Sequence, residues 1–196
     1  MKTTLVNKEQ YQTTEWAGGN STEIFIYPFH TSYKDRNFSI RISTAIIERF
    51  ESEFTHLPGI HRKLTVLSGA LLIEHPAHHT TLLLAYDTDT FEGDWNTKCK
   101  GTGTDFNVMT HREVRSEVKV LEIESGQTTS IPVESKTKLI HFYLPVGEAI
   151  LSISDKAFKL SEGMSLVIEE NDTQFDIRLQ SKAGCVILLS EFKNVS

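Results

Sequence analysis

The sequence has little cysteine and no apolar run long enough to cross a membrane. Of its 196 residues, only Cys99 and Cys185 are cysteines, and they do not form a CxxC pair. A membrane helix needs about 20 consecutive apolar residues, and segment 1–12 also lacks the apolar core of a secretory signal. These absences predict a cytoplasmic protein with reduced thiols and no membrane partner. The sequence leaves open whether the two cysteines pair.

The sequence also lacks a basic block. Its formal net charge is −6, and neither half concentrates lysine and arginine. Nucleic-acid binding normally requires such a cluster, so no nucleic-acid partner is expected. With 39% hydrophobic and 23% charged residues, the composition is that of a globular chain with one large core or two small ones.

Common catalytic signatures are missing. The sequence has no G-x-S-x-G elbow, no phosphate-binding GxxxxGK[ST] loop, no H-E-x-x-H and no GxGxxG leading into a helix. We therefore assign no catalytic residue and no cofactor. A carboxylate such as Asp105 or Glu23 stays a candidate general base if the protein is an enzyme.

Alternation of apolar and polar residues predicts β-strands along most of the chain. Glycine-containing turns separate many short segments, a pattern typical of all-β sandwiches and barrels. Short helices are expected at 7–10 and in part of 44–49. Strands are expected at 24–27, 38–45, 63–73 (broken at Ser68-Gly69), 80–86, 105–110, 117–124, 138–144, 148–153, 157–160, 164–169, 174–180 and 184–192.

The two halves show a degenerate repeat. Each reads as a strand, a glycine turn at Gly69 or Gly147, a second strand, a loop and a Glu-Gly turn. Two similar β-barrels explain this repeat most simply. We expect domains at 1–114 and 115–196, whose terminal strands can exchange between barrels.

The segment from Phe91 to Met109 is the most informative stretch. Expected turns at Gly93 and at 101–103 precede a strand with two distinct faces. Asp105, Asn107 and Met109 share one face, and Phe106 and Val108 share the other. This pattern predicts the wall of a polar cavity. Alternatively, Asp105 and Asn107 cap the turn at 101–103.

Several motifs together resemble the HutD/Ves family over residues 16–112. The matching residues are Trp16, Gly18-Gly19, Thr22-Glu23, Arg41-Ile42-Ser43, Ala45, Phe54, Pro58-Gly59, Arg62, Leu64, Val66-Leu67, Gly69, Phe91, Gly93-Asp94, Asp105-Phe106-Asn107, Met109 and Arg112. Thr55 and His111 are mild departures, which bear on ligand preference. The resemblance implies an all-β bicupin of two RmlC-like jelly-roll barrels and a small-molecule-binding role in histidine utilisation or stress response. By analogy with other cupins, it also implies a homodimer paired through β edges.

Metal-binding cupins carry a G-x5-H-x-H-x3-4-E-x6-G motif. When its last glycine is aligned with Gly69, Arg62 stands in place of the ligand glutamate. A guanidinium repels a metal ion but holds a planar anion through two parallel hydrogen bonds. The comparison therefore predicts a metal-free pocket suited to a carboxylate.

Two alternatives remain for the arginines. Arg41 and Ser43 lie on the strand face opposite Ile40 and Ile42, and that face is either the lumen or solvent. Arg62 either contacts the ligand or pairs with a surface carboxylate such as Glu51 or Glu53. The predicted ligand-binding residues are Arg41, Ser43, Arg62, Asp105, Asn107, Met109, Trp16 and Glu23.

Three histidines lie close together in segment 74–79. His75, His78 and His79 surround a proline-containing turn between two strands. Such a cluster can capture zinc or nickel. We expect a solvated hairpin loop instead, and predict no metal ligands.

Three functions follow from these patterns. The first is a non-enzymatic bicupin that binds a small carboxylate metabolite as a sensor or limiter of amino-acid utilisation. The second is a metal-independent isomerase or hydrolase acting on a similar acid. The third is a structural or interaction protein with a packed lumen and an assembling barrel edge.

Overall fold

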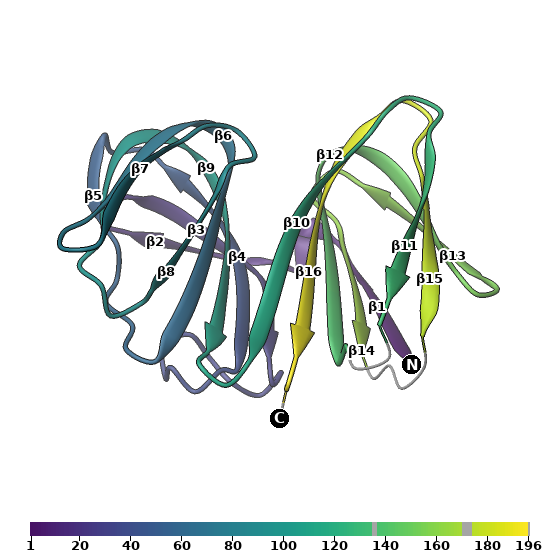
Figure 1. Ribbon diagram of the computed structural model, residues 1–196, viewed down its shortest axis with the longest axis horizontal. Helices are drawn as coiled ribbons and strands as arrows, with labels where there is room; N and C mark the ends of the chain where they lie inside the picture. Colours follow the sequence, from purple (N-terminus) through teal and green to yellow (C-terminus); the bar gives the residue numbers. More distant parts are fainter. Residues whose placement is uncertain (135–136, 170–173, 196) are drawn as a thin grey trace. The chain divides into compact units, whose positions relative to one another are not determined.

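Two eight-stranded sheets make up the structure (Figure 1), a computed structural model that describes residues 1–134, 137–169 and 174–195. One short 3-10 helix, η1 (Lys8–Gln10), is the helical element in these ranges. The all-β prediction is confirmed, as is a helical turn near 7–10, whereas the helix expected within 44–49 is wrong because strand β4 continues to Ile47. No helix in the described ranges is long and apolar enough to span a membrane.

The chain divides into two compact units, Tyr11–Val114 and Met1–Gln10 with Arg115–Ser196. We call them the first and second unit. In the second unit the amino-terminal strand β1 pairs with β14 from the carboxy-terminal half.

The first unit contains one of the sheets, in the order β2-β3-β4-β9-β6-β7, with β5 on β9 and β8 on β6. Its strands are β2 (Gln12–Trp16), β3 (Gly19–Tyr27), β4 (Ile40–Ile47), β5 (Glu51–Glu53), β6 (Ile60–His75), β7 (His79–Leu83), β8 (Thr88–Glu92) and β9 (Lys98–His111).

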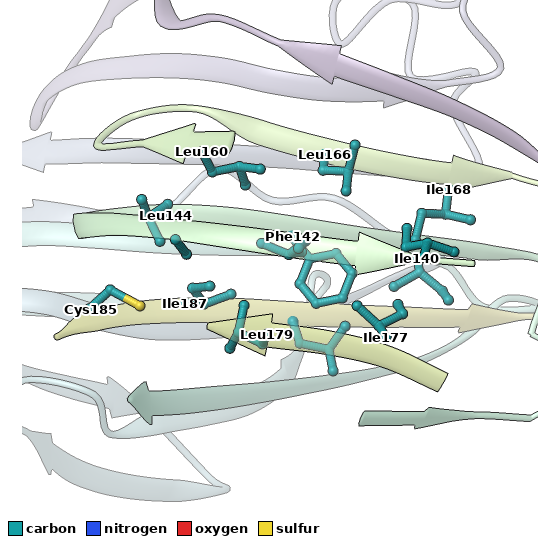
Figure 2. Close-up of a cluster of buried hydrophobic side chains, with 14 of the residues drawn as sticks. Ile140, Phe142, Leu144, Leu160, Leu166, Ile168, Ile177, Leu179, Cys185 and Ile187 are labelled. Carbon is teal, nitrogen blue, oxygen red and sulfur yellow. The ribbon is translucent and has the colours of Figure 1, made fainter. Parts of the chain in front are cut away.

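The second unit contains the other sheet, in which β12 pairs with β13, β14, β15 and β16. Its strands are β1 (Lys2–Val6), β10 (Arg115–Ile123), β11 (Thr128–Val133), β12 (Leu139–Ile153), β13 (Lys156–Ser161), β14 (Ser165–Glu169), β15 (Phe175–Gln180) and β16 (Cys185–Lys193). Figure 2 shows its core, where apolar side chains from β12 to β16 point toward one another around Phe142.

Both units contain one long strand where the sequence predicts two. Strand β6 runs through Gly69, and β12 runs through Gly147, so the turns expected at these glycines are wrong. Each strand changes register with its neighbour just before the glycine, between Val66 and Ser68 on β6 and between Tyr143 and Val146 on β12. A register shift bends a strand without ending it.

The expected turn at 101–103 is also absent, because both glycines lie within β9. Gly103 pairs with Gly69 of β6, and a β-carbon on Gly103 would overlap the Ser68 carbonyl oxygen. Glycine is needed here for close strand approach rather than for a turn. With no turn to cap, the capping role considered for Asp105 and Asn107 is excluded.

Gly93 follows β8 and fixes the 54–59 loop against it. Its amide donates to the Ile60 carbonyl at 2.7 Å, and its own carbonyl accepts from the Leu57 amide at 2.6 Å. A β-carbon here would overlap the Leu57 carbonyl oxygen and lie 2.9 Å from that of Ile60.

Gly93→Ala is therefore expected to destabilise the first unit by about 3 kcal/mol, since two backbone segments must move. Urea unfolding followed by tryptophan fluorescence measures this, because Trp16 and Trp95 both lie in the first unit. Gly59→Ala is the control, since Gly59 has φ +78° but nothing within 4 Å of an added β-carbon. The control should lose roughly 1–2 kcal/mol, and equal losses in both variants would contradict the close-approach argument.

Candidate functional site

Three adjacent strands build the floor of a cavity in the first unit. Strand β9 lies between β4 and β6, and Met109 on β9 pairs with Arg41 on one side and with Arg62 on the other. In the same way, Asn107 pairs with Ser43 and Asp105 with Ala45. The two arginines are thus two strand spacings apart, about 10 Å between Cα atoms.

The first half of strand β4 is buried on both faces. Arg41 is 4% exposed and Ser43 is buried, while Ile40 and Ile42 are buried on the opposite face. The solvated alternative for Arg41 is therefore wrong.

Contacts with several side chains hold the Arg41 guanidinium. Its Nε donates to the Glu23 carboxylate at 2.8 Å, and its Nη1 donates to Ser43 Oγ at 3.0 Å. The guanidinium carbon also lies 4.3 Å from the centre of the Tyr33 ring. These contacts fix its orientation before any ligand arrives.

Arg62 is held differently, by aromatic faces instead of a counter-ion. It is 5% exposed, and its guanidinium carbon lies 5.1 Å from the Phe54 ring centre and 5.0 Å from that of Phe91. Its Nε has no hydrogen-bond partner among the described residues. Burial lowers the pKa of Arg62 to about 10, although the Asp105 carboxylate opposes this shift. The side chain stays charged at neutral pH. Because Arg62 is buried, the surface ion-pair alternative is wrong.

Asp105 provides a carboxyl group in the same cavity. Burial raises its pKa to about 7, while the Arg62 charge, a hydrogen bond from the Ala45 backbone and the Arg41 charge oppose this rise. The Oδ1 atoms of Asp105 and Asn107 lack partners in the described part of the chain. Buried polar atoms are rarely left unpaired, so a cavity that collects several of them indicates a site for a ligand or for ordered water.

The cavity has a volume of about 130 Å³. Every predicted ligand-binding residue lines it except Glu23, which instead bonds to Arg41. The remaining lining residues are Thr14, Glu15, Ser21, Tyr33, Ala45, Phe54 and Thr55. Thr14, Glu15 and Thr55 are exposed and mark the mouth, with half-buried Trp16 beside them.

The sequence analysis missed Tyr33 and Phe54 as site residues. Tyr33 lies between β3 and β4, where no periodicity shows which way a side chain points. Phe54 belongs to the matching motif, but its packing against Arg62 depends on a loop that Gly93 positions.

The cavity does not fit a divalent metal ion. Its lining contains two guanidiniums and neither histidine nor cysteine. Divalent metals are held by converging imidazole, thiolate or carboxylate ligands. Glu23 bonds to Arg41, but the Nε of Arg62 has no partner among the described residues, so this second guanidinium favours an anion instead.

The prediction of a solvated histidine loop is wrong for His75. This residue is 1% exposed, and its ring bonds to both Thr97 and Asp89. His79 bonds to the same carboxylate, whereas His78 stacks on Trp95 with ring centres 3.7 Å apart. Local sequence patterns could not reveal this arrangement, because the partners lie 14 and 22 residues beyond His75.

Comparisons with known proteins place the chain among cupin-like folds. A family model described as HutD matches residues 8–187. No match is found among curated proteins.

Three solved structures are similar over nearly the whole chain. A conserved protein of unknown function from Pseudomonas aeruginosa PAO1 has a TM-score of 0.89 at 18% identity, over 98% of this chain and 100% of that one. HutD from Pseudomonas fluorescens SBW25, in a formate condition, has a TM-score of 0.76 at 20% identity over 100% of both chains. The bacterial pirin of Escherichia coli in complex with nickel(II) has a TM-score of 0.73 at 9% identity, over 99% of this chain and 100% of that one. Identities this low show the fold alone.

Charged groups buried in the cavity should reduce stability. We expect the double variant Arg62→Met, Asp105→Asn to have a free energy of unfolding about 1–4 kcal/mol higher than the unchanged protein, because two desolvated groups are replaced by neutral ones of similar size. Its urea midpoint should therefore be higher. Tryptophan fluorescence at neutral pH measures the transition. A lower midpoint would show that the two groups act as a structural ion pair.

Proposed function

The chain belongs to the HutD family of cupin-like proteins, and we propose that its first-unit cavity binds a small carboxylate metabolite without a metal ion. The family match supports the HutD resemblance found in the sequence. The carboxylate specificity is our inference from the cavity.

One observation carries this proposal: Arg62 is a buried cation whose Nε has no hydrogen-bond partner among the described residues. A charged donor in this state gains most from a charged acceptor. A carboxylate accepts two parallel hydrogen bonds from a guanidinium, and the two opposite charges compensate each other. Arg41, already oriented by Glu23 and Ser43, supplies a second positive edge to the same cavity.

The size of the cavity limits the ligand. A cavity of about 150 Å³ accommodates benzene, which has about six heavy atoms, and this one has about 130 Å³. A short acid therefore fills the interior, and a longer one extends past Trp16 at the mouth.

The ligand should also carry a hydrogen-bond donor. Asp105 Oδ1 and Asn107 Oδ1 are buried acceptors without partners in the described residues. A hydroxyl, amine or amide N–H on the acid would satisfy one of them, and an acid without such a group leaves it unpaired. We therefore favour hydroxy, amino and acylamino acids over simple fatty acids.

We further propose that the two sheets form the two jelly-roll barrels of a bicupin. The long strands β6 and β12, each bent at a glycine, support a duplicated architecture. In this proposal the protein acts as a non-enzymatic sensor or limiter in histidine or amino-acid utilisation or in a stress response, and pairs with a second copy through β edges.

A metal-independent enzyme is the second candidate, and the pKa of Asp105 favours it. A group with a pKa of about 7 exchanges protons readily at neutral pH. In this role Asp105 moves a proton on the bound acid, as an isomerase or hydrolase requires.

The third possibility, an interaction protein with a packed lumen, is opposed by the open volume beside the arginines.

Binding should depend on the guanidinium of Arg62 and on its shape. Calorimetry and thermal shifts of the metal-stripped protein with formate, glutamate, N-formylglutamate, pyroglutamate and urocanate would identify the ligand. Arg62→Met should weaken binding of that acid by about 10- to 100-fold, the value of one charge-assisted hydrogen bond. Arg62→Lys keeps the charge but not the planar fork, so its loss should be smaller.

Arg112→Ala is the matched control, because it removes the same charge from an exposed side chain. It should leave affinity unchanged, while Arg41→Ala combined with Arg62→Ala should abolish binding. If the double variant binds as tightly as the unchanged protein, neither arginine holds the ligand. Turnover of a bound acid that Asp105→Asn abolishes would favour the enzyme instead.

Carboxylate affinity should fall as pH rises through about 7. Below this pH Asp105 is neutral and does not offset the positive charge of the two guanidiniums. Above it, the ionised Asp105 carboxylate repels the carboxylate of the ligand, which is ionised throughout this range. Calorimetry across neutral pH tests this. Asp105→Asn should flatten the profile, and an unchanged fall in that variant would assign the effect to another group.

A further inference from the structure

A second group of polar side chains in the first unit lies outside the cavity. His75 ends β6 and pairs directly with His79, which begins β7. Asp89 comes from β8, which also pairs with β6. Three strands therefore bring these side chains together, and we call them the His-His-Asp cluster.

The Asp89 carboxylate joins the two rings. One of its oxygens accepts from His75 Nε2 at 2.9 Å, and the other accepts from His79 Nε2 at 2.9 Å. The three potential ligand atoms all lie within 4.8 Å of one another. A tetrahedral ion with bonds of about 2.1 Å holds its ligands about 3.4 Å apart. Reaching that spacing requires side-chain rotation, and His79, whose side chain is 39% exposed, is the least buried of the three.

His75 is also supported on its other side. Its Nδ1 lies 2.9 Å from Thr97 Oγ1, and that hydroxyl lies 3.4 Å from the Trp95 carbonyl oxygen. Its ring packs on Phe91 and Trp95, with ring centres 4.6 and 5.3 Å away. Metal-bound imidazoles usually donate their second N–H to such a partner, which fixes the ring and its tautomer.

We propose that the His-His-Asp cluster binds one divalent first-row transition-metal ion, such as Zn²⁺, through His75 Nε2, His79 Nε2 and an Asp89 oxygen. Two imidazoles and a carboxylate suit zinc, cobalt and nickel, and water completes the coordination on the exposed side of His79. None of these three residues lines the carboxylate cavity.

The protons balance within the cluster. Without metal, each ring donates its Nε2 proton to Asp89. Binding replaces both hydrogen bonds with metal bonds, and each ring carries its proton on Nδ1 instead. For His75 that proton is donated to Thr97, whose hydroxyl turns toward the Trp95 carbonyl. Two neutral histidines therefore bind the ion with no net proton release.

The competing explanation is a hydrogen-bonded brace that ties the β6–β7 hairpin to β8. The neighbouring residues separate the two explanations. His78 belongs to the same turn but stacks on Trp95 and takes no part in the cluster. It is thus a matched control for weak chelation by a histidine-rich turn.

The test uses the untagged, metal-stripped full chain with Zn²⁺ in calorimetry and with Co²⁺ in visible absorption. We expect one ion per chain, and a cobalt spectrum typical of tetrahedral or five-coordinate nitrogen and oxygen ligation. Thr97→Val, which removes a supporting residue, should lower metal affinity about 10- to 100-fold. His79→Ala, which removes a ligand, should lower it by more than ~100-fold. His78→Ala should bind the metal as tightly as the unchanged protein.

Other results would overturn the proposal. If the unchanged protein shows no saturable binding, the cluster is a brace. If His78→Ala weakens binding as much as His79→Ala, the turn chelates metal adventitiously. Because His75 is buried, the partly exposed His79 is the residue to replace, and circular dichroism of each variant verifies its fold.

Discussion

The cavity of the first unit depends on the burial of one guanidinium, that of Arg62. Removing a charge from water costs several kcal/mol unless neighbours compensate for it, and Arg62 lies between Phe54 and Phe91 with its Nε unpaired among the described residues. Ring faces attract a desolvated cation by about 2 kcal/mol. The Asp105 charge adds attraction but is itself weakened by burial, which raises its pKa to about 7. The unit thus retains a cation that its own side chains satisfy only in part, which is a condition for binding an anion tightly.

Strand geometry explains how this condition arises. Residues 105–110 of strand β9 are buried, so alternate side chains face two different buried environments. Phe106 and Val108 fill the apolar side, whereas Asp105 and Asn107 face the cavity, and pairing with β4 and β6 aligns an arginine on either side of Met109. The polar site is therefore a consequence of register, because a slip by one residue would exchange the two faces.

Much of this could be predicted from alternation. The two-residue period of a strand predicts which face Arg41 and Asp105 share with their neighbours, and both side chains line the cavity. Glycine was harder to interpret, because the sequence does not distinguish a turn from close strand approach, as at Gly103. The environment of His75 was not accessible either, since its burial depends on Asp89 and Thr97, which join it through tertiary pairing. Local patterns reveal which face a side chain occupies, but not which distant group meets it there.

Phe91 links the two polar regions of the first unit. Its ring centre lies 5.0 Å from the Arg62 guanidinium carbon and 4.6 Å from the His75 ring centre. The Arg62 guanidinium and the His75 ring are therefore within about 10 Å of each other, a separation at which charges in a protein still interact at an effective dielectric constant near 20. An ion at His75 would strengthen anion binding beside Arg62 and would disfavour the arginine's own charge. An apolar ring between them keeps the sites chemically separate, but not electrostatically independent.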